Sequence, residues 1–192
     1  MTQRIIVGIT GASGVIYGIR ALEALSRQPD VESHLILSDS AETNIAIETD
    51  YSADQVRALA DVVHNDNNLA ATIASGSVKT AGMMIAPCSI KTLSGVATAY
   101  ADSLIVRAAD VVLKESRRLV LVVRETPLHL GHLKLQVQAA EAGAIILPPV
   151  PAFYHEPESV DDIVNHTVGR IFDQFDLDHD LYRRWGSPRK QR

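Results

Sequence analysis

The sequence has few of the features that mark secreted or membrane proteins. Its 192 residues include one cysteine, Cys88, so no internal disulfide is possible, and we expect a reducing, cytoplasmic location. It has no run of roughly 18 or more uncharged apolar residues, which argues against a membrane-spanning helix. Its N-terminus carries one basic side chain and no long apolar stretch ending in small residues, so we expect no secretory signal.

Aromatic residues and positive charge are also scarce. Phe, Trp and Tyr make up 5% of the chain while hydrophobic residues make up 46%, which favours aliphatic packing of helices on a sheet over an aromatic-rich β-sandwich. The formal net charge of −5 argues against a broad nucleic-acid-binding face. The length suits one domain, and no internal repeat or break in composition divides it. We therefore predict a single domain over residues 1–186 and a basic C-terminal tail at 187–192.

Hydrophobic patterning alternates between strand and helix along the chain. Short apolar or β-branched runs predict strands at 4–10, 31–37, 82–86, 119–123 and 144–147. Apolar residues at helical spacing predict helices at 15–27, 41–49, 52–61, 89–100, 103–117, 129–142 and 159–175. Residues 65–80 show no firm period and are predicted to be irregular. The alternation indicates a three-layer, doubly wound α/β fold of the Rossmann or flavodoxin-like type, with a mostly parallel sheet of five or six strands.

Polar residues follow the predicted strands at their carboxyl ends. In an open parallel sheet, ligands bind beyond these ends. The polar clusters are residues 11–14, 38–40, 88–92, 124–127 and 153–155. We expect the five clusters to converge on one edge of the sheet.

The first cluster, Gly11-Ala12-Ser13-Gly14, suits a phosphate. Its small side chains let backbone N–H groups and a helix N-terminus approach an anion, and Ser13 adds a hydroxyl. The spacing is not G-x-G-x-x-G, and a tight strand–helix turn without a ligand explains it equally well. A short-chain dehydrogenase is disfavoured, because no tyrosine is followed by lysine at the Tyr-x-x-x-Lys spacing.

Two other clusters carry charge. Ser89, Lys91 and Thr92 open a predicted helix, where they suit an anion, although helix capping plus a surface lysine explains them equally well. Arg124 and Glu125 come directly after an apolar strand, where unpaired burial is costly. They are either ligand-binding groups or members of an ion pair.

The remaining candidates are weaker. Cys88 follows a buried strand and is better interpreted as a small hydrophobic residue than as an activated thiol. His129 and His132 lie three apart, but no third ligand at metal spacing accompanies them, so we predict no metal site.

Many short motifs occur in order along the chain. They are TGASG (10–14), Ser38, IETD (47–50), PCSIKTL (87–93), RAADV (107–111), Lys114-Glu115, VRETPL (123–128), PAFYH (151–155), Arg170 and Arg184-Trp185. This order and spacing resembles that of the flavin prenyltransferases, the UbiX-like group, over roughly residues 4–186. The resemblance is strongest to the members that accompany hydroxyaryl (phenolic) acid decarboxylases.

The resemblance implies a reaction between two substrates. The family binds reduced FMN and dimethylallyl monophosphate, joins the prenyl C1′ to flavin N5, and closes a fourth ring through C3′ and C6. The product, prenylated FMN, serves a UbiD-like aromatic or phenolic acid decarboxylase. The family needs no metal, and this sequence has no Asp-rich metal-binding motif.

By matched position, the resemblance also implies roles for individual residues. FMN would be held by Gly11, Ala12, Ser13, Ser38, Ser89, Ile90, Lys91, Thr92, Arg107 and Arg124. The dimethylallyl phosphate would be held by Lys114, Arg124, Tyr154, Arg170 and Trp185. The catalytic residues would be Ser13, Glu48, Lys114 and Glu125, with Ser13 and Glu48 assisting proton movement at N5.

Two positions depart from the family pattern. Ser116 stands where the family commonly has arginine, which we expect to change the turn before the strand at 119–123 and to leave Lys114 in place. Asp39 stands where several relatives have lysine, so the charge near FMN differs.

Other functions remain open at this point. The chain could be a non-catalytic FMN-binding subunit or a direct phenolic acid decarboxylase, although a carrier would not need Glu48, Lys114, Glu125, Tyr154 and Arg170. A flavin-dependent cysteine decarboxylase is disfavoured, because its Pro-Ala-Ser-Ala-Asn-Thr motif is missing. The family resemblance implies a homododecamer. Since the matched residues leave no chain for a lid domain, we expect neighbouring subunits to complete the site.

Overall fold

The computed structural model describes residues 2–186, which form six strands, seven α-helices and a 3₁₀ turn at Thr72–Ala74. The strands are β1 (Gln3–Ile9), β2 (Val31–Leu37), β3 (Val62–Asn65), β4 (Gly82–Cys88), β5 (Arg118–Val123) and β6 (Ile145–Ile146). The helices are α1 (Ile16–Leu25), α2 (Asp39–Glu48), α3 (Ala53–Arg57), α4 (Ile90–Thr98), α5 (Leu104–Lys114), α6 (Leu130–Glu141) and α7 (Val160–Asp173). None of these helices is long and apolar enough to cross a membrane. The basic tail predicted at 187–192 lies outside the described residues.

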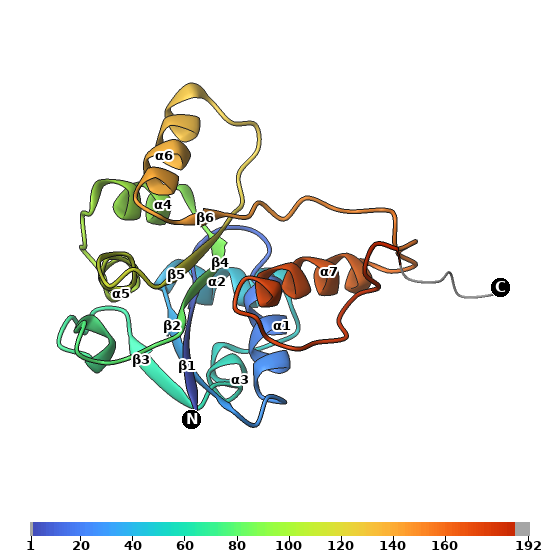
Figure 1. Cartoon of the computed structure of the whole chain (residues 1–192), viewed down its shortest axis with the longest axis horizontal. Helices are drawn as coiled ribbons and strands as arrows, with labels where there is room; N and C mark the ends of the chain where they lie inside the picture. The colour runs from blue at the N-terminus through green and yellow to red at the C-terminus, as the bar shows by residue number, and fades with distance from the viewer. Residues whose placement is uncertain (1, 187–192) are drawn as a thin grey trace.

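The strands form one parallel sheet in the order β3-β2-β1-β4-β5-β6 (Figure 1). Ile5 of the central strand β1 pairs with Ser33 of β2 on one side and with Gly82 of β4 on the other. The chain order reverses between β1 and β4, where an open α/β sheet leaves a crevice at its carboxyl edge. The predicted three-layer, doubly wound fold is confirmed.

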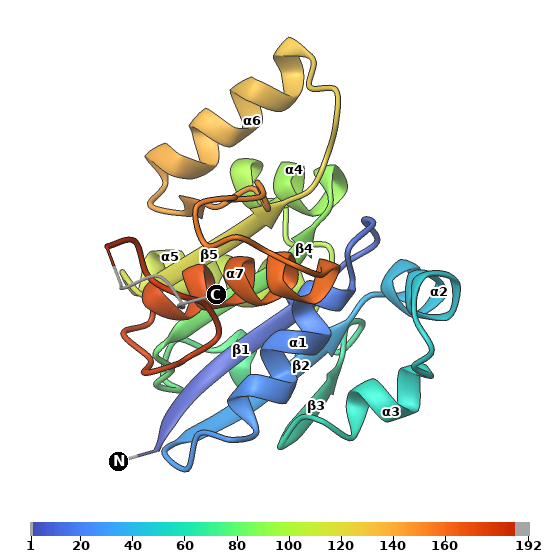
Figure 2. The same cartoon turned by 90° about the vertical axis from the view of Figure 1, so that its right-hand side faces the viewer.

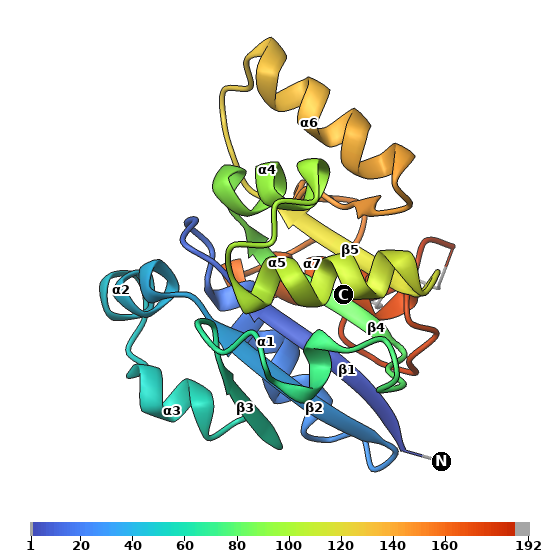
Figure 3. The same cartoon turned by 90° about the vertical axis from the view of Figure 1, so that its left-hand side faces the viewer.

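Helices cover both faces of the sheet, which explains why the central strands are apolar throughout. α1 and α7 lie on one face (Figure 2) and α4 and α5 on the other (Figure 3). Val7 packs in the same buried cluster as Leu22 of α1 and Phe172 of α7. Its neighbour Ile6 points the other way, into the cluster that contains Leu104 of α5. α6 packs beside α4 and stands at the far edge of the molecule (Figure 1).

The structure contains a strand that the sequence analysis missed. β3 pairs with β2 at the edge of the sheet, and its four residues alternate between half-buried and exposed. A strand of four residues with one packed face has too few apolar residues for its alternation to be recognised in the sequence. The helix predicted at 52–61 is α3, which ends at Arg57 and leaves room for β3. The segment predicted to be irregular, 65–80, holds the last residue of β3 and the 3₁₀ turn.

β4 also runs further than predicted, through Pro87 to Cys88. The Ala86–Pro87 bond is cis, and the pairing with β5 shifts register between Ile85 and Cys88. Since proline cannot donate a ladder hydrogen bond, the irregularity falls where the strand meets it. The strand therefore ends directly before Ser89.

Candidate active site

A cavity of about 380 Å³ opens at the carboxyl ends of the central strands. Its walls come from the ends of β1, β2, β4 and β5 and from the loop before α5. The lining residues are Thr10, Gly11, Ala12, Ser13, Ser38, Ser40, Asp66, Ser89, Ile90, Lys91, Thr92, Asp102, Ser103, Ile105, Val106, Arg124 and Glu125. Four of the five polar clusters predicted from the sequence therefore meet here, and the fifth, 153–155, does not line this cavity.

Three helices begin at the cavity. Ser38 caps α2 by accepting a hydrogen bond from the amide of Ala41, and Ser89 caps α4 by accepting one from the amide of Thr92. At α5, the Asp66 carboxylate accepts a hydrogen bond of 2.8 Å from the amide of Ile105. The positive ends of these helix dipoles meet at the cavity, which suits an anion.

Thr10 joins the two loops that form the floor. Its Oγ1 donates to the carbonyl of Pro87 at 2.8 Å and accepts from the amide of Ser89 at 2.8 Å. Because Thr10 is buried, this pair of bonds holds the loop at 11–13 against the start of α4. Both loops are predicted from the sequence, but the role of Thr10 in joining them is visible only in the structure.

Gly11 has no room for a side chain. A Cβ at this position would lie 2.3 Å from the Cβ of Ser40, which also lines the cavity. The backbone of Gly11 therefore packs directly on the first turn of α2. The sequence shows only that a glycine follows a strand, and the contact between Gly11 and Ser40 is visible only in the structure.

Charged side chains of both signs line the cavity. Lys91 and Arg124 supply positive charge, while Asp66, Asp102 and Glu125 supply negative charge. Burial raises the pKa of Asp66, and hydrogen bonds from Ile105 and Ser103 only partly offset this. Neither aspartate was predicted from the sequence, although Asp102 lies just before the start of α5, where an acidic residue is a recognisable signal.

Glu48 does not line the cavity but supports its loop. Its Oε2 accepts hydrogen bonds from the amides of Gly14, at 2.7 Å, and Val15, at 3.4 Å. These amides lie at the start of α1, where a carboxylate also meets the positive end of the helix dipole. The predicted catalytic carboxylate thus contacts the loop that carries Ser13.

Neither Lys114 nor Arg107 lines the cavity of its own chain. α5 begins at the cavity and reaches Lys114 ten residues later, about 15 Å along its axis. Nζ of Lys114 pairs with Oε1 of Glu115 at 2.5 Å. Arg107 pairs with Asp110 at 2.6 Å and donates to the carbonyl of Ala74. A single chain does not bring these two predicted ligands to the other site residues.

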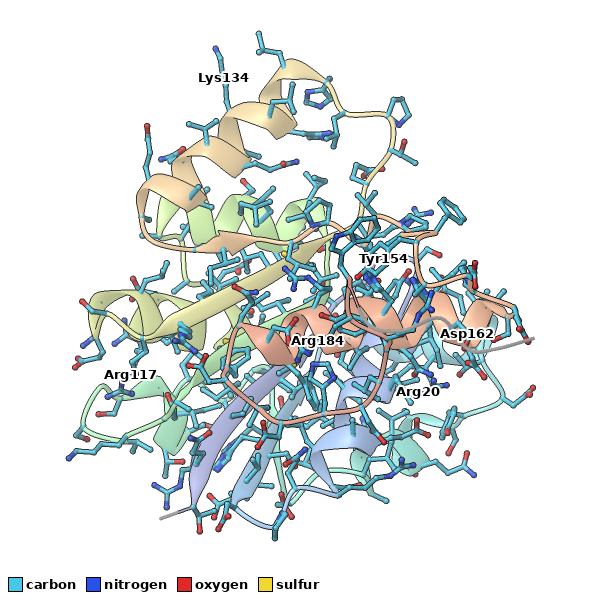
Figure 4. The ribbon with its side chains drawn as sticks, turned by 45° about the vertical axis from the view of Figure 1, so that its right-hand side comes forward. Arg20, Arg117, Lys134, Tyr154, Asp162 and Arg184 are labelled. Carbon is cyan, nitrogen blue, oxygen red and sulfur yellow. The ribbon has the colours of Figure 1, made fainter. Side chains whose placement is uncertain are left out.

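Tyr154 lies beside α7 (Figure 4), and its ring contacts that of Trp185. Their rings meet edge to face with centroids 5.3 Å apart, and Trp185 is 80% exposed. Oη of Tyr154 lies 3.0 Å from Nε2 of His166 on α7. The predicted donor-binding residues Tyr154 and Trp185 therefore form a second cluster with a different set of neighbours.

Arg170, the third predicted donor-binding residue on this side, is held by Asp173. The two side chains form an ion pair at 2.8 Å on the last turn of α7. Burial acts to raise the pKa of Asp173, but hydrogen bonds from Arg184, Tyr182 and His179 outweigh it and hold the pKa well below its usual range. The aspartate therefore stays ionised and anchors the guanidinium groups around it.

Tyr17 links the two clusters. Burial raises its pKa, while a hydrogen bond with Thr167 of α7 and the charge of Arg124 act in the opposite direction. Tyr17 thus lies within reach of the cavity residue Arg124 and of the helix that carries His166 and Arg170.

Cys88 is free and fully buried. Burial raises the pKa of its thiol, so the nucleophilic thiolate is disfavoured. The interpretation of Cys88 as a small hydrophobic residue fits this position. Among residues 2–186, no group of three or more His, Cys, Asp or Glu side chains is arranged to hold a metal ion.

The doubly wound α/β fold and its cavity define a class of ligand-binding proteins, and comparisons with known proteins identify the family. A family model described as Flavoprotein matches residues 1–172. Flavin prenyltransferase UbiX of Escherichia coli K12 is 60% identical over 185 residues, which is 95% of this chain and 98% of the relative.

Two solved structures are also similar. A dodecameric FMN-dependent UbiX-like decarboxylase of E. coli O157:H7 has a TM-score of 0.94 and 53% identity, covering 96% of this chain and 100% of its own. AnUbiX (PadA1), in complex with FMN and dimethylallyl pyrophosphate, has a TM-score of 0.95 and 50% identity, covering 98% and 100%. The chain belongs to the flavoprotein family and, within it, groups with the UbiX flavin prenyltransferases.

The cavity fits FMN in size and chemistry. Its volume lies in the range of roughly 300–1,000 Å³ that is usual for cofactor pockets. Ser38, Ser89 and the amides of α4 can bind a phosphate, while Ile105 and Val106 supply apolar contact for a ring system.

Proposed function

We propose that this protein is a flavin prenyltransferase that transfers a dimethylallyl group from dimethylallyl monophosphate to N5 and C6 of reduced FMN. The observation that carries the proposal is the cavity, where three helix N-termini meet beside Arg124 and Glu125. The flavin supplies the nucleophilic N5 and C6. The 60% identity to a curated flavin prenyltransferase supports the reaction.

Within this proposal, the cavity binds FMN. The phosphate and the polar edges of FMN are held by Ser13, by Ser38 and by the N-terminus of α4, which comprises Ser89, Ile90, Lys91 and Thr92. The small residues Gly11 and Ala12 let the backbone approach FMN closely. Arg124 adds a fixed positive charge. Glu48 and Ser13 handle the proton at N5, since Glu48 contacts the backbone one residue after Ser13.

The donor phosphate requires separate cations. As the allylic C–O bond breaks, negative charge develops on the phosphate oxygens, and fixed Lys and Arg donors stabilise it. We assign this role to Lys114, Arg124 and Arg170, with Tyr154 as a neutral donor, rather than to a metal. Glu125 lies next to Arg124, and Trp185 can stabilise positive charge on the prenyl fragment by a cation–π contact of roughly 0.5–2 kcal/mol.

We further propose that the protein works as a homododecamer. One similar structure is dodecameric. α6 presents a row of exposed apolar side chains, Leu130, Leu133 and Val137, of which Leu130 is 67% exposed. Such a row is typical of an interface. A neighbouring chain would also bring Lys114 and Arg107 to the cavity.

We propose a UbiD-like decarboxylase as the recipient of the prenylated FMN. The resemblance to members that accompany phenolic acid decarboxylases supports this partner. A cytoplasmic location fits the single free cysteine.

Anaerobic incubation with reduced FMN and dimethylallyl monophosphate tests the reaction. Mass spectrometry of the released flavin should show the addition of C5H8, with one inorganic phosphate released per flavin. Flavin of unchanged mass, with FMN binding retained, would identify a carrier instead. Release of CO2 from a phenolic acid by the protein without prenyl donor would indicate a direct decarboxylase. Repeating the assay with the diphosphate establishes which donor gives the higher kcat/KM.

A further inference from the structure

His166 is a buried polar residue that none of the sequence motifs contains. It lies on α7 with 7% of its surface exposed. Its Nε2 lies 3.0 Å from Oη of Tyr154. The imidazole stacks on the ring of His155, with ring centroids 4.8 Å apart and an interplanar angle of 7°. It also meets the ring of Tyr182 in an edge-type contact, with centroids 4.7 Å apart. These contacts leave the imidazole little freedom to turn.

Tyr154 is held at both ends by this arrangement. Its carbonyl accepts a hydrogen bond of 3.1 Å from Arg183, and its hydroxyl meets His166. His155, which follows it, has both ring nitrogens buried without a hydrogen-bond partner in the described chain, so its ring serves as a stacking surface. The position of the Tyr154 hydroxyl therefore depends on His166.

The direction of the Tyr154–His166 hydrogen bond decides what the hydroxyl can offer a ligand. A phenol carries one proton. If Tyr154 donates it to His166, only lone pairs face the ligand, and these repel an anion. If Nε2–H of His166 donates to Oη, the phenolic proton is free for a phosphate oxygen.

The surroundings of His166 determine its charge. Burial lowers its pKa, as do the charges of His155 and Arg170, while Asp173 acts in the opposite direction. Near pH 7 the ring is therefore neutral and has one N–H to place, so the choice of tautomer matters.

We propose that His166 is a positioning residue that donates its Nε2–H to Tyr154 and so directs the phenolic proton to the phosphate of the prenyl donor. This inference rests on the proposed function, because that function assigns Tyr154 to the donor phosphate. His166 itself does not touch the substrate.

Three variants of His166 test the inference. His166→Leu removes the N–H, whereas the amide of His166→Gln places a donor near the position of Nε2. His166→Asn is the matched polar control, because its amide reaches only the position of Nδ1. Each is measured by calorimetric binding of dimethylallyl monophosphate, by KM and kcat, and by FMN affinity.

His166→Leu and His166→Asn should raise the Kd and KM for the donor about tenfold, because the Tyr154 hydroxyl is then no longer held with its proton toward the phosphate. Their kcat and FMN affinity should change little, and His166→Gln should retain affinity within about threefold. In the Tyr154→Phe background, His166→Leu should have no further effect, because the two residues act through one hydroxyl.

Unchanged donor affinity in His166→Leu, equal losses in the Gln and Asn variants, or additive losses with Tyr154→Phe would overturn the inference. If His166→Leu fails to fold, the Gln and Asn variants alone decide. If the parent protein binds the donor but does not prenylate FMN, the proposed function fails while the binding series still tests His166. A parent that does not bind the donor would overturn both.

Discussion

At the residue scale, the contact between Gly11 and Ser40 limits what the cavity can accept. Gly11→Ala places a Cβ 2.3 Å from the Cβ of Ser40, so the loop or α2 must shift. Both residues line the cavity, and we expect FMN affinity to fall about tenfold, equivalent to about one lost hydrogen bond. Fluorescence titration with FMN measures the change.

The double variant Gly11→Ala/Ser40→Gly is the control. Removing the Ser40 side chain removes the clash, and affinity should recover in part, because the Ser40 hydroxyl is also lost. If Ser40→Gly gives no recovery in the Gly11→Ala background, the steric explanation is wrong.

Glu48 allows its structural and chemical roles to be separated. In Glu48→Gln the amide oxygen can still accept from Gly14, so FMN affinity should stay within about threefold. Prenyl transfer should fall by roughly 10²–10⁴, the usual range for loss of a general acid or base. Glu48→Ala should impair both, since the amide of Gly14 then loses its acceptor. Parent-like turnover in Glu48→Gln would remove the carboxylate from the mechanism.

His64 predicts how stability depends on pH. The pKa of His64 is lowered by burial and by the charge of His34, whose Nδ1 lies 2.9 Å from Nε2 of His64. Nε2 of His34 lies 2.8 Å from Oε1 of Glu32, which holds the His34 ring beside that of His64. Placing a positive charge on His64 beside His34 therefore lowers the free energy of unfolding.

The sign follows from proton binding. Below the ordinary histidine pKa of about 6.5, the unfolded chain binds a proton that folded His64 resists, so stability falls as pH falls. Urea midpoints should drop between pH 7.5 and pH 5.5. His64→Gln should reduce the drop, and part should remain because the pKa of His166 is also lowered. An unchanged drop in His64→Gln would exclude His64 as its source.

At the element scale, two helices end in the same motif with different residues. After α5, the amide of Arg117 donates to Val112, and that of Ser116 to Leu113; after α6, Gly143 occupies the position of Ser116. This Schellman motif needs positive φ, which is 54° at Ser116 and 106° at Gly143.

Ser116→Gly should therefore raise the free energy of unfolding by about 0.5–1 kcal/mol. Glycine removes the strain of the left-handed backbone at this position, and this gain exceeds the free-energy cost of the extra conformational entropy that glycine gives the unfolded chain. Gly143→Ala should lower it by about 1 kcal/mol or more, because a Cβ there meets only Leu113 at 3.7 Å and the cost is conformational. Thermal and urea denaturation measure both. A loss of stability in Ser116→Gly would show that the serine side chain contributes more than the strain costs.

The same scale shows what the sequence could predict. Strands such as β1 and β5 are continuous apolar runs, and Ser89 is a local capping signal, so β1, β5 and α4 were found. β3 is missed because its signal depends on pairing with β2. Asp66 is missed for the same reason, since its role as a cap of α5 joins segments 39 residues apart.

At the scale of the whole molecule, the predicted site separates into two groups. Residues that directly follow strands, such as Ser13, Ser89 and Arg124, meet in one cavity because the topology of a parallel sheet requires it. Lys114 lies at the other end of α5, and no periodicity in one chain indicates how copies assemble. The family resemblance implies that Lys114 acts with the others, and we expect a neighbouring chain to connect the two positions.

Mixed oligomers test that connection. Lys114→Ala and Arg124→Ala should each be inactive alone, because each lacks a cation for the donor phosphate. When the two chains are co-expressed with different tags, a site shared between subunits takes an intact Lys114 from one chain and an intact Arg124 from another. Random mixing then restores about one quarter of the sites, and native mass spectrometry confirms the mixing.

Ser13→Ala mixed with Arg124→Ala is the matched control. Both residues line the same cavity of one chain, so every cavity in this mixture carries one lesion and activity should not return. Recovery with Lys114→Ala and none with Ser13→Ala would establish that α5 delivers its lysine to a neighbour's cavity. If neither mixture recovers activity, Lys114 acts within its own chain. In that case α5 or the segment around Gly76, which adjoins Lys114, must rearrange, because Lys114 lies at the end of α5 that is remote from the cavity.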